Sequence, residues 1–161
     1  MMRTLSPARL ANALSPQDRE RLMEYGREHN FPQGKRLFEE GSIADRFWIV
    51  RSGTVTLDMR VPGRGPAVIE RLGPGELVGW SWLLRPYIWH NSAEAETPVR
   101  ADEFNATAVR TAMNEDPAFG AMIGNWVTSV LAFRLQGTRL RLLDEYALHG
   151  GVVLTSRTSG A

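Results

Sequence analysis

The sequence predicts an α+β fold: an antiparallel β-roll of the double-stranded β-helix or jelly-roll type, with N-terminal helices and a long C-terminal helix. Helical patterning opens the chain, and short β-like runs separated by glycine or proline fill residues 30–104. Turn signals recur there about every 8 to 12 residues, a spacing typical of sandwiches and barrels. A long apolar stretch without proline then follows Pro117, which favours a helix.

The predicted elements form one domain over residues 1–148. Ser15 is the expected N-cap of the second helix, with Pro16 at its first position and Asp18 in its first turn, and the helix is expected to end near His29-Asn30. The predicted bounds are: helices within 6–29, the β-roll over 30–104 with strands 36–40, 46–52, 54–61, 67–72, 91–96 and 99–104, helices within 106–148, and a flexible tail over 149–161.

Composition restricts the class of protein. The chain has 161 residues, of which 43% are hydrophobic and 23% charged, and this suits one folded domain. No run reaches the roughly 18 uncharged apolar residues of a membrane helix, and no signal peptide is visible, so we expect a cytoplasmic protein. The chain has no cysteine, which excludes disulfides and thiolate chemistry. Its net charge of +1 favours neither nucleic acid nor anionic lipid as a partner.

The last helix is expected to begin at Pro117, after the cap Asp116, and to end at Gly150-Gly151. At about 1.5 Å per residue it would be roughly 45 Å long, too long for a small domain to cover. A second apolar stripe (Val127, Leu131, Leu135 and Leu142) lies to one side of its main seam. We predict that one stripe packs on the sheet and the other on a second copy, giving a homodimer; packing within the monomer alone is the alternative. The heptad-like seam is Phe119, Ile123, Trp126, Val130, Phe133, Gly137 and Leu140.

Two motifs carry a family resemblance. In residues 41–57, GSIADRFWIVRSGTVTL, Gly41 and Gly53 supply turns and apolar residues alternate between and after them. Residues 72–79, LGPGELVG, form a second turn-rich motif. Together they resemble the cyclic-nucleotide-binding domain of the Crp/Fnr family of bacterial regulators, in which the second motif leads into a phosphate-binding cassette. The resemblance spans about residues 5–146 and implies the β-roll fold and a regulatory role.

In that family, the cassette's helix N-terminus and one arginine hold the cyclic phosphate, and a glutamate directly after the glycine binds the ribose. Here the cassette, residues 79–93, has Trp80 at the glutamate position and Trp89 or His90 at the arginine position. Losing both charge-assisted interactions removes about 3 to 6 kcal/mol, or about 10² to 10⁴ in affinity. The remaining alternatives are that Arg85 reaches the phosphate, that His90 serves as a weaker cation, or that the ligand is not a cyclic nucleotide.

The aromatic residues of the cassette have two interpretations. They form a remodelled pocket that stacks a flat ligand or docks a partner protein, or they fill the phosphate pocket and close it. On the long helix, Arg134, Thr138 and Arg139 lie near where family members contact the base, and a solvated helix face is the alternative. The candidate ligand-binding residues are Gly79, Trp80, Ser81, Trp82, Leu83, Arg85, Trp89, His90, Asn91, Thr138 and Arg139.

The sequence does not support a metal site, an enzyme active site or a DNA-binding module. The three histidines His29, His90 and His149 are isolated, so neither a metal site nor an enzyme is expected, although His90 leaves a haem-sensing variant open. About a dozen residues follow the long helix, too few for a helix-turn-helix module, and direct DNA binding is not expected. We predict a stand-alone sensor that binds a small molecule other than cAMP or cGMP, or binds these much more weakly, without a certain cofactor. It would signal through its dimer helix to an unknown downstream protein; the alternative is a ligand-free scaffold or protein-interaction module with an aromatic-filled pocket.

Overall fold

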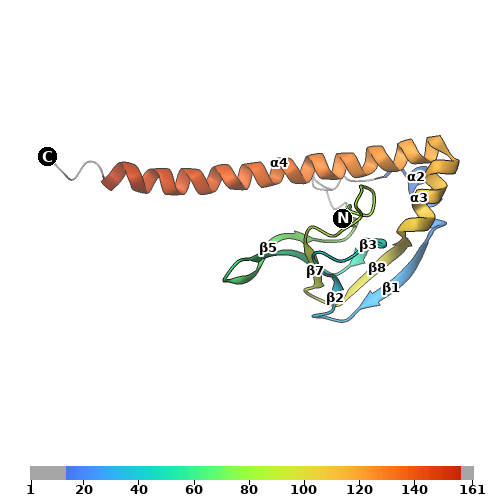
Figure 1. The fold of residues 1–161 in the computed structure, drawn as a ribbon, viewed down its shortest axis with the longest axis horizontal. Coiled ribbons are helices and arrows are strands. Elements are labelled where there is room, and N and C mark those ends of the chain that lie inside the picture. The colour runs from blue at the N-terminus through green and yellow to red at the C-terminus, as the bar shows by residue number, and fades with distance from the viewer. Residues whose placement is uncertain (1–13, 157–161) are drawn as a thin grey trace, which may run out of the picture.

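Two β-sheets lie beside a helix that continues far past them (Figure 1). The computed structural model describes residues 14–156, so the part of the predicted N-terminal helices before residue 14 lies outside the described residues. The elements in chain order are α2 (Pro16–Met23), β1 (Gly26–Phe31), β2 (Arg36–Phe38), β3 (Arg46–Ser52), β4 (Val55–Val61), β5 (Gly65–Leu72), β6 (Leu77–Val78), β7 (Ser92–Ala95), β8 (Val99–Asn105), α3 (Ala106–Glu115) and α4 (Pro117–Ser156).

Helix α2 begins where the sequence predicts it but ends earlier. Ser15 is its N-cap, and the side-chain oxygen accepts a hydrogen bond from the backbone N–H of Asp18 at 3.2 Å. The prediction that this helix reaches Asn30 is wrong, because the chain forms β1 from Gly26 onward and pairs with β8. Residues 27–30 are all exposed and offer no apolar helix face, so strand pairing decides their conformation. The roll therefore begins at residue 26 and not at residue 30.

The roll consists of two four-stranded antiparallel sheets, ordered β1-β8-β3-β6 and β2-β7-β4-β5. The strands predicted over 46–52, 54–61, 91–96 and 99–104 are confirmed to within one residue at each end. The strand predicted over 36–40 ends at Phe38, and the one predicted over 67–72 begins at Gly65. Strand β6 was not predicted, because two residues show no periodicity.

Aromatic rings cover both faces of β3. Trp48 stacks on Phe38 of β2 with ring centroids 5.8 Å apart, which places it between the two sheets. Phe47, the preceding residue, stacks on Phe104 of β8 at 4.8 Å, and both rings are fully buried. Because successive strand residues point to opposite faces, these neighbours build two separate aromatic clusters. The cassette meets both of them.

Helix α4 starts as predicted and runs further than predicted. Asp116 caps it by accepting hydrogen bonds from the backbone N–H groups of Ala118 and Phe119 at 3.0 and 3.3 Å. Its 40 residues correspond to about 60 Å, and its second half projects past the roll (Figure 1). The prediction that Gly150-Gly151 ends the helix, with a loose tail from residue 149, is wrong, since both glycines lie within it. Glycine weakens a helix by about 1 kcal/mol relative to alanine but does not by itself stop one.

The segment Pro117–His149 is long and apolar enough to cross a membrane by length and composition alone. This differs from the expectation that no run of the chain reaches that limit. Of the most apolar window, 33% is buried inside the fold, and Ile123 and Val130 belong to the hydrophobic core. A core helix passes the same test, so the segment is only weak evidence for a membrane.

Candidate functional site

The cassette begins at Gly79, where the backbone leaves β6. Gly79 has a φ of +92°, a conformation that glycine adopts without strain. A β-carbon added there would lie 2.5 Å from Cη2 of Trp89. The indole ring of Trp89 therefore packs directly on the backbone of Gly79, and both the backbone angle and the close approach require glycine.

Trp89 is part of the core. Its side chain is 3% exposed and stacks on Phe38 with ring centroids 3.8 Å apart, while the ring of Trp48 lies 6.4 Å away. The backbone N–H of Trp89 donates to the carbonyl of Ser42 at 2.9 Å, and its carbonyl accepts from the N–H of Gly41 at 2.8 Å. The ring at one of the two possible arginine positions is thus held between the sheets of the roll.

Trp82 is buried in the second aromatic cluster. Its side chain is fully buried, stacks on Phe47 at 4.1 Å, and donates a hydrogen bond from Nε1 to the carbonyl of Gly79 at 3.1 Å. Arg110 of α3 donates to the carbonyl of Trp82 at 2.6 Å, and its guanidinium lies 4.1 Å from the ring centre of Tyr87. Sequence reasoning missed Arg110, because no local motif indicates that α3 reaches the cassette.

The other cassette residues divide by exposure. Trp80 is half-buried and stacks on the exposed ring of His90 at 5.6 Å. Arg85 is exposed, and its side chain forms no hydrogen bond or ion pair within residues 14–156, so it does not reach back into the cassette. Ser81 is buried, and Leu83 and Asn91 are half-buried.

Arg134 is the buried cation of this region. Its residue is 8% exposed, and Nη2 donates to the carbonyl of Leu77, two residues before Gly79. Among the residues that the structure describes, Nε and Nη1 find no hydrogen-bond partner. Burial lowers the pKa of Arg134, and the carboxylates of Glu70 and Glu76 oppose that shift. Of the three helix residues considered near the base position, only Arg134 points into the fold.

Thr138 and Arg139 lie on the exposed part of α4. The hydroxyl of Thr138 donates to the carbonyl of Arg134 at 3.0 Å, inside the helix, so it bonds its own backbone. Burial raises the pKa of Glu70 on β5, while Arg134 and Arg141 lower it. The charges of Arg134 and Arg141 on α4 thus act on the carboxyl of Glu70.

The predicted dimer seam of α4 is divided by the structure. Its first four residues, from Phe119 to Val130, are at most 6% exposed and pack in the core of their own chain. Phe133 and Leu140 are 37% and 53% exposed. The heptad spacing did not reveal this division, because the same apolar period serves packing on a sheet and packing on another helix. Large exposed apolar side chains on α4 begin at Phe133 and continue to Leu148.

The comparisons identify the family. Residues 28–116, more than half of the chain, match the family model described as a cyclic nucleotide-binding domain. The chain belongs to this family, and the predicted Crp/Fnr-like resemblance is confirmed. A CRP-like cAMP-activated global transcriptional regulator of Mycobacterium tuberculosis is 31% identical over 115 residues, which are 71% of this chain and 50% of the relative. The chain thus spans about half the length of this curated relative.

Solved structures show the same fold. The catabolite activator protein of Thermus thermophilus matches with a TM-score of 0.67 at 26% identity, over 83% of this chain and 61% of that one. A cyclic nucleotide-binding domain from Methylobacillus flagellatus matches with a TM-score of 0.74 at 20% identity, over 82% of this chain and 74% of that one. These relatives are named as regulators and binding domains and not as enzymes, which supports a regulatory class for this chain.

Proposed function

We propose that this protein is a cytoplasmic regulatory sensor that responds to a small molecule other than cAMP or cGMP and signals through a homodimer formed by α4. The observation that carries the proposal is the indole of Trp89, packed on Gly79 in the cassette. That ring occupies space at the cassette's first residue and supplies no positive charge for a cyclic phosphate. Together with Trp80 in place of the ribose-binding glutamate, it leaves the cassette without its two defining polar contacts.

Arg134 supports a retained ligand response. Nε and Nη1 of this buried guanidinium find no acceptor among residues 14–156, and such nitrogens are unfavourable unless another molecule or water supplies one. Its bond to the carbonyl of Leu77 joins α4 to the strand that enters the cassette. An effector that accepts hydrogen bonds from Nε and Nη1 would therefore connect the roll to the helix, the coupling that a sensor requires.

A thermal-shift panel tests the ligand response. We expect cAMP and cGMP at about millimolar concentration to give no stabilisation, because the loss of two charge-assisted contacts weakens binding by about 10² to 10⁴. We expect small carboxylates or phosphate esters to stabilise the wild-type chain and to lose this effect in Arg134→Met. Arg139→Met, on the exposed face of the same helix, is the matched control. A clear stabilisation by cAMP would refute the proposal.

The alternative is a ligand-free interaction module. The full burial of Trp82 and the 3% exposure of Trp89 favour it, because these rings serve as core. In that case no member of the panel changes the melting temperature, while α4 still binds its partner. The panel therefore distinguishes the two functions.

The part of α4 from Leu135 onward provides the proposed dimer surface. Leu135, Leu142 and Tyr146 are spaced by seven and four residues, so they share one helix face, and they are 52%, 57% and 71% exposed. At about 100° per residue, that face is turned away from Val130 and Arg134, which pack on the roll. The roll of the same chain cannot cover it. A second copy of α4 would bury it, as in a two-helix coiled coil.

We expect the wild-type chain to sediment as a dimer at micromolar concentration, at twice 18.0 kDa. The double variant Leu135→Asp, Leu142→Asp should weaken dimerisation by at least about a hundredfold, because each buried leucine contributes about 1.5 to 3 kcal/mol. Ile43→Asp, at a residue that is 71% exposed and far from α4 in sequence, is the control and should remain dimeric. A wild-type monomer at that concentration would contradict the proposal.

A further inference from the structure

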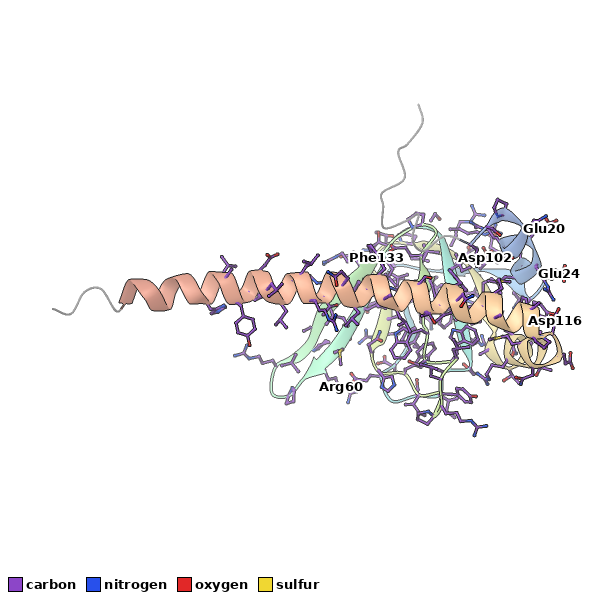
Figure 2. All side chains as sticks on the ribbon, turned by 90° about the horizontal axis from the view of Figure 1, so that it is seen from above. Glu20, Glu24, Arg60, Asp102, Asp116 and Phe133 are labelled. Carbon is purple, nitrogen blue, oxygen red and sulfur yellow. The ribbon has the colours of Figure 1, made fainter. Side chains whose placement is uncertain are left out.

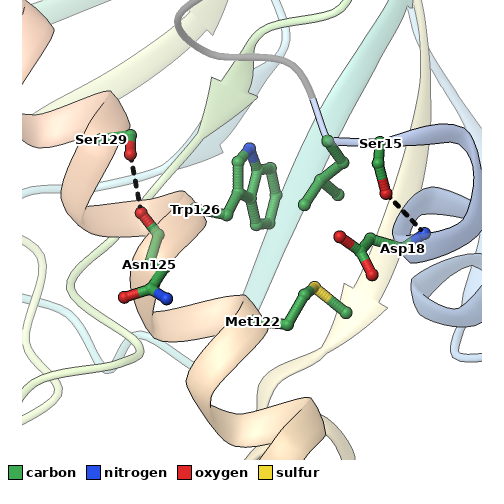
Figure 3. Close-up of a pocket in the computed structure, with 7 residues that line it drawn as sticks. Ser15, Asp18, Met122, Asn125, Trp126 and Ser129 are labelled. Carbon is green, nitrogen blue, oxygen red and sulfur yellow. Dashed lines mark hydrogen bonds between the residues drawn. The ribbon is translucent and has the colours of Figure 1, made fainter.

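A cavity of about 390 Å³ lies between α2 and α4, and no cassette residue lines it (Figure 3). This volume is within the range of small-molecule sites. The start of α2 supplies one wall and the first half of α4 supplies the other. The lining residues within the described part of the chain are Leu14, Ser15, Asp18, Met122, Asn125, Trp126 and Ser129.

The two serine hydroxyls that line this cavity already form hydrogen bonds within the chain, which leaves the carboxylate of Asp18 to be considered. Ser15 accepts a hydrogen bond from the backbone N–H of Asp18, and Ser129 donates to the carbonyl of Asn125 at 2.9 Å. Within the part of the chain that the structure describes, the carboxylate of Asp18 forms no hydrogen bond or ion pair. Asp18 is half-buried, and Figure 3 shows its carboxylate on the side of the cavity that faces Trp126.

The basic residues of α2 are Arg19 and Arg21, and neither belongs to the described lining of the cavity. The guanidinium of Arg21 pairs with Asp116 and lies 4.8 Å from the ring centre of Phe119. Among the residues that the structure describes, the cavity lining contains one acidic side chain and no basic one. A positive charge on a ligand in the cavity would therefore lie beside the carboxylate of Asp18.

The apolar lining suits the body of such a ligand. Trp126 is 6% exposed, and its indole lines the cavity beside the thioether of Met122 (Figure 3). Tryptophan is the side chain whose ring attracts cations most strongly, and its surface also accepts alkyl chains. A carboxylate, an indole and a thioether together match a guanidinium or ammonium group carried on a short alkyl chain.

We propose that the cavity between α2 and α4 binds an organic cation, with its guanidinium or ammonium on Asp18 and its alkyl part on Trp126 and Met122. The site is separate from the cassette and goes beyond the proposed sensor function. Because the ligand touches both helices, its binding strengthens the contact between α2 and α4. The cation belongs either to a free amine or guanidine or to a basic side chain of a partner protein.

Calorimetric titration of the full chain tests this site with N-butylguanidinium and its neutral isostere N-butylurea. We expect the guanidinium to bind at least about tenfold more tightly than the urea, and Asp18→Asn to weaken it by at least about tenfold. Asp18→Glu should retain binding. Glu20→Gln, a charge loss on the exposed side of α2, is the matched control and should leave affinity unchanged (Figure 2).

A tri-arginine peptide distinguishes the two sources of the cation. Binding that is at least about tenfold tighter for the peptide than for N-butylguanidinium, and still dependent on Asp18, supports a protein side chain. Equal or weaker peptide binding with the same dependence supports a free small molecule. Equal affinity for the guanidinium and the urea, unchanged affinity in Asp18→Asn with native unfolding, or no binding at all overturns the proposal. The sedimentation experiment and the thermal-shift panel test the proposed sensor function separately, so their results can be interpreted whatever the outcome of this titration.

Discussion

Trp89→Ala should lower the free energy of unfolding by about 3 to 5 kcal/mol. The indole is 3% exposed, stacks on Phe38 at 3.8 Å and covers Gly79, where no β-carbon fits. Removing it deletes a large apolar surface and leaves a cavity between the two sheets. Urea denaturation monitored by circular dichroism measures the change.

Trp80→Ala is the matched control, since it removes the same ring from the same cassette. Trp80 is half-buried and stacks on His90, which is itself exposed. Its removal should therefore cost much less, about 1 kcal/mol. If both variants lose the same free energy, Trp89 lines an open pocket and the closed-cassette description is refuted. The difference between the two losses in free energy of unfolding thus measures how much more Trp89 contributes to the hydrophobic core than Trp80 does.

Arg51→Met should lower the free energy of unfolding by about 3 kcal/mol. Asp102 of β8 is 0% exposed, and its Oδ1 lies 2.6 Å from Nε of Arg51 on the neighbouring strand β3. No residue that the structure describes gives this carboxylate a hydrogen bond. Losing Arg51 leaves a buried negative charge without its counter-ion.

The double variant Arg51→Met, Asp102→Asn should recover a large part of that loss, because it removes the buried charge together with its partner. Arg71→Met is the control. Its ion pair with Glu96 joins side chains that are 61% and 40% exposed, and such surface pairs contribute about 0 to 1 kcal/mol. Guanidinium denaturation would obscure charge effects, so urea is the appropriate denaturant. Equal losses for Arg51→Met and Arg71→Met would contradict the prediction.

Much of the roll is readable from local sequence. Strands β3, β4, β7 and β8 show alternation bounded by turn residues, and the structure confirms them to within one residue. The cap at Ser15 and the start of α4 at Pro117 are equally local, since side chain and backbone interact within three residues. By contrast, β1 looked helical because the pairing that makes it a strand lies about 75 residues away, on β8.

The conformation of the cassette likewise depends on contacts with residues that are distant in sequence. The family resemblance indicates that Trp80, and either Trp89 or His90, stand where polar nucleotide-binding side chains are expected. An open aromatic pocket and a filled one are both compatible with these residues. The structure places Trp89 against Phe38 and Trp82 against Phe47, both distant in sequence. From the sequence, Arg134 could equally lie on a solvated helix face. In the structure it donates a hydrogen bond to the carbonyl of Leu77 and lies inside the fold.

The sequence by itself determined the β-roll class, the family motifs and the presence of a long apolar helix. It also led to the prediction, through the family resemblance, that two nucleotide-binding side chains are missing. These properties depend on residue type and short spacing. Only the tertiary structure decided that Trp82 and Trp89 serve as core, that the residues of α4 up to Val130 pack on their own roll, and that Asp18 faces a cavity beside Trp126. Such outcomes depend on which distant surfaces meet, and a hydrophobic period specifies that a face is buried without specifying what buries it.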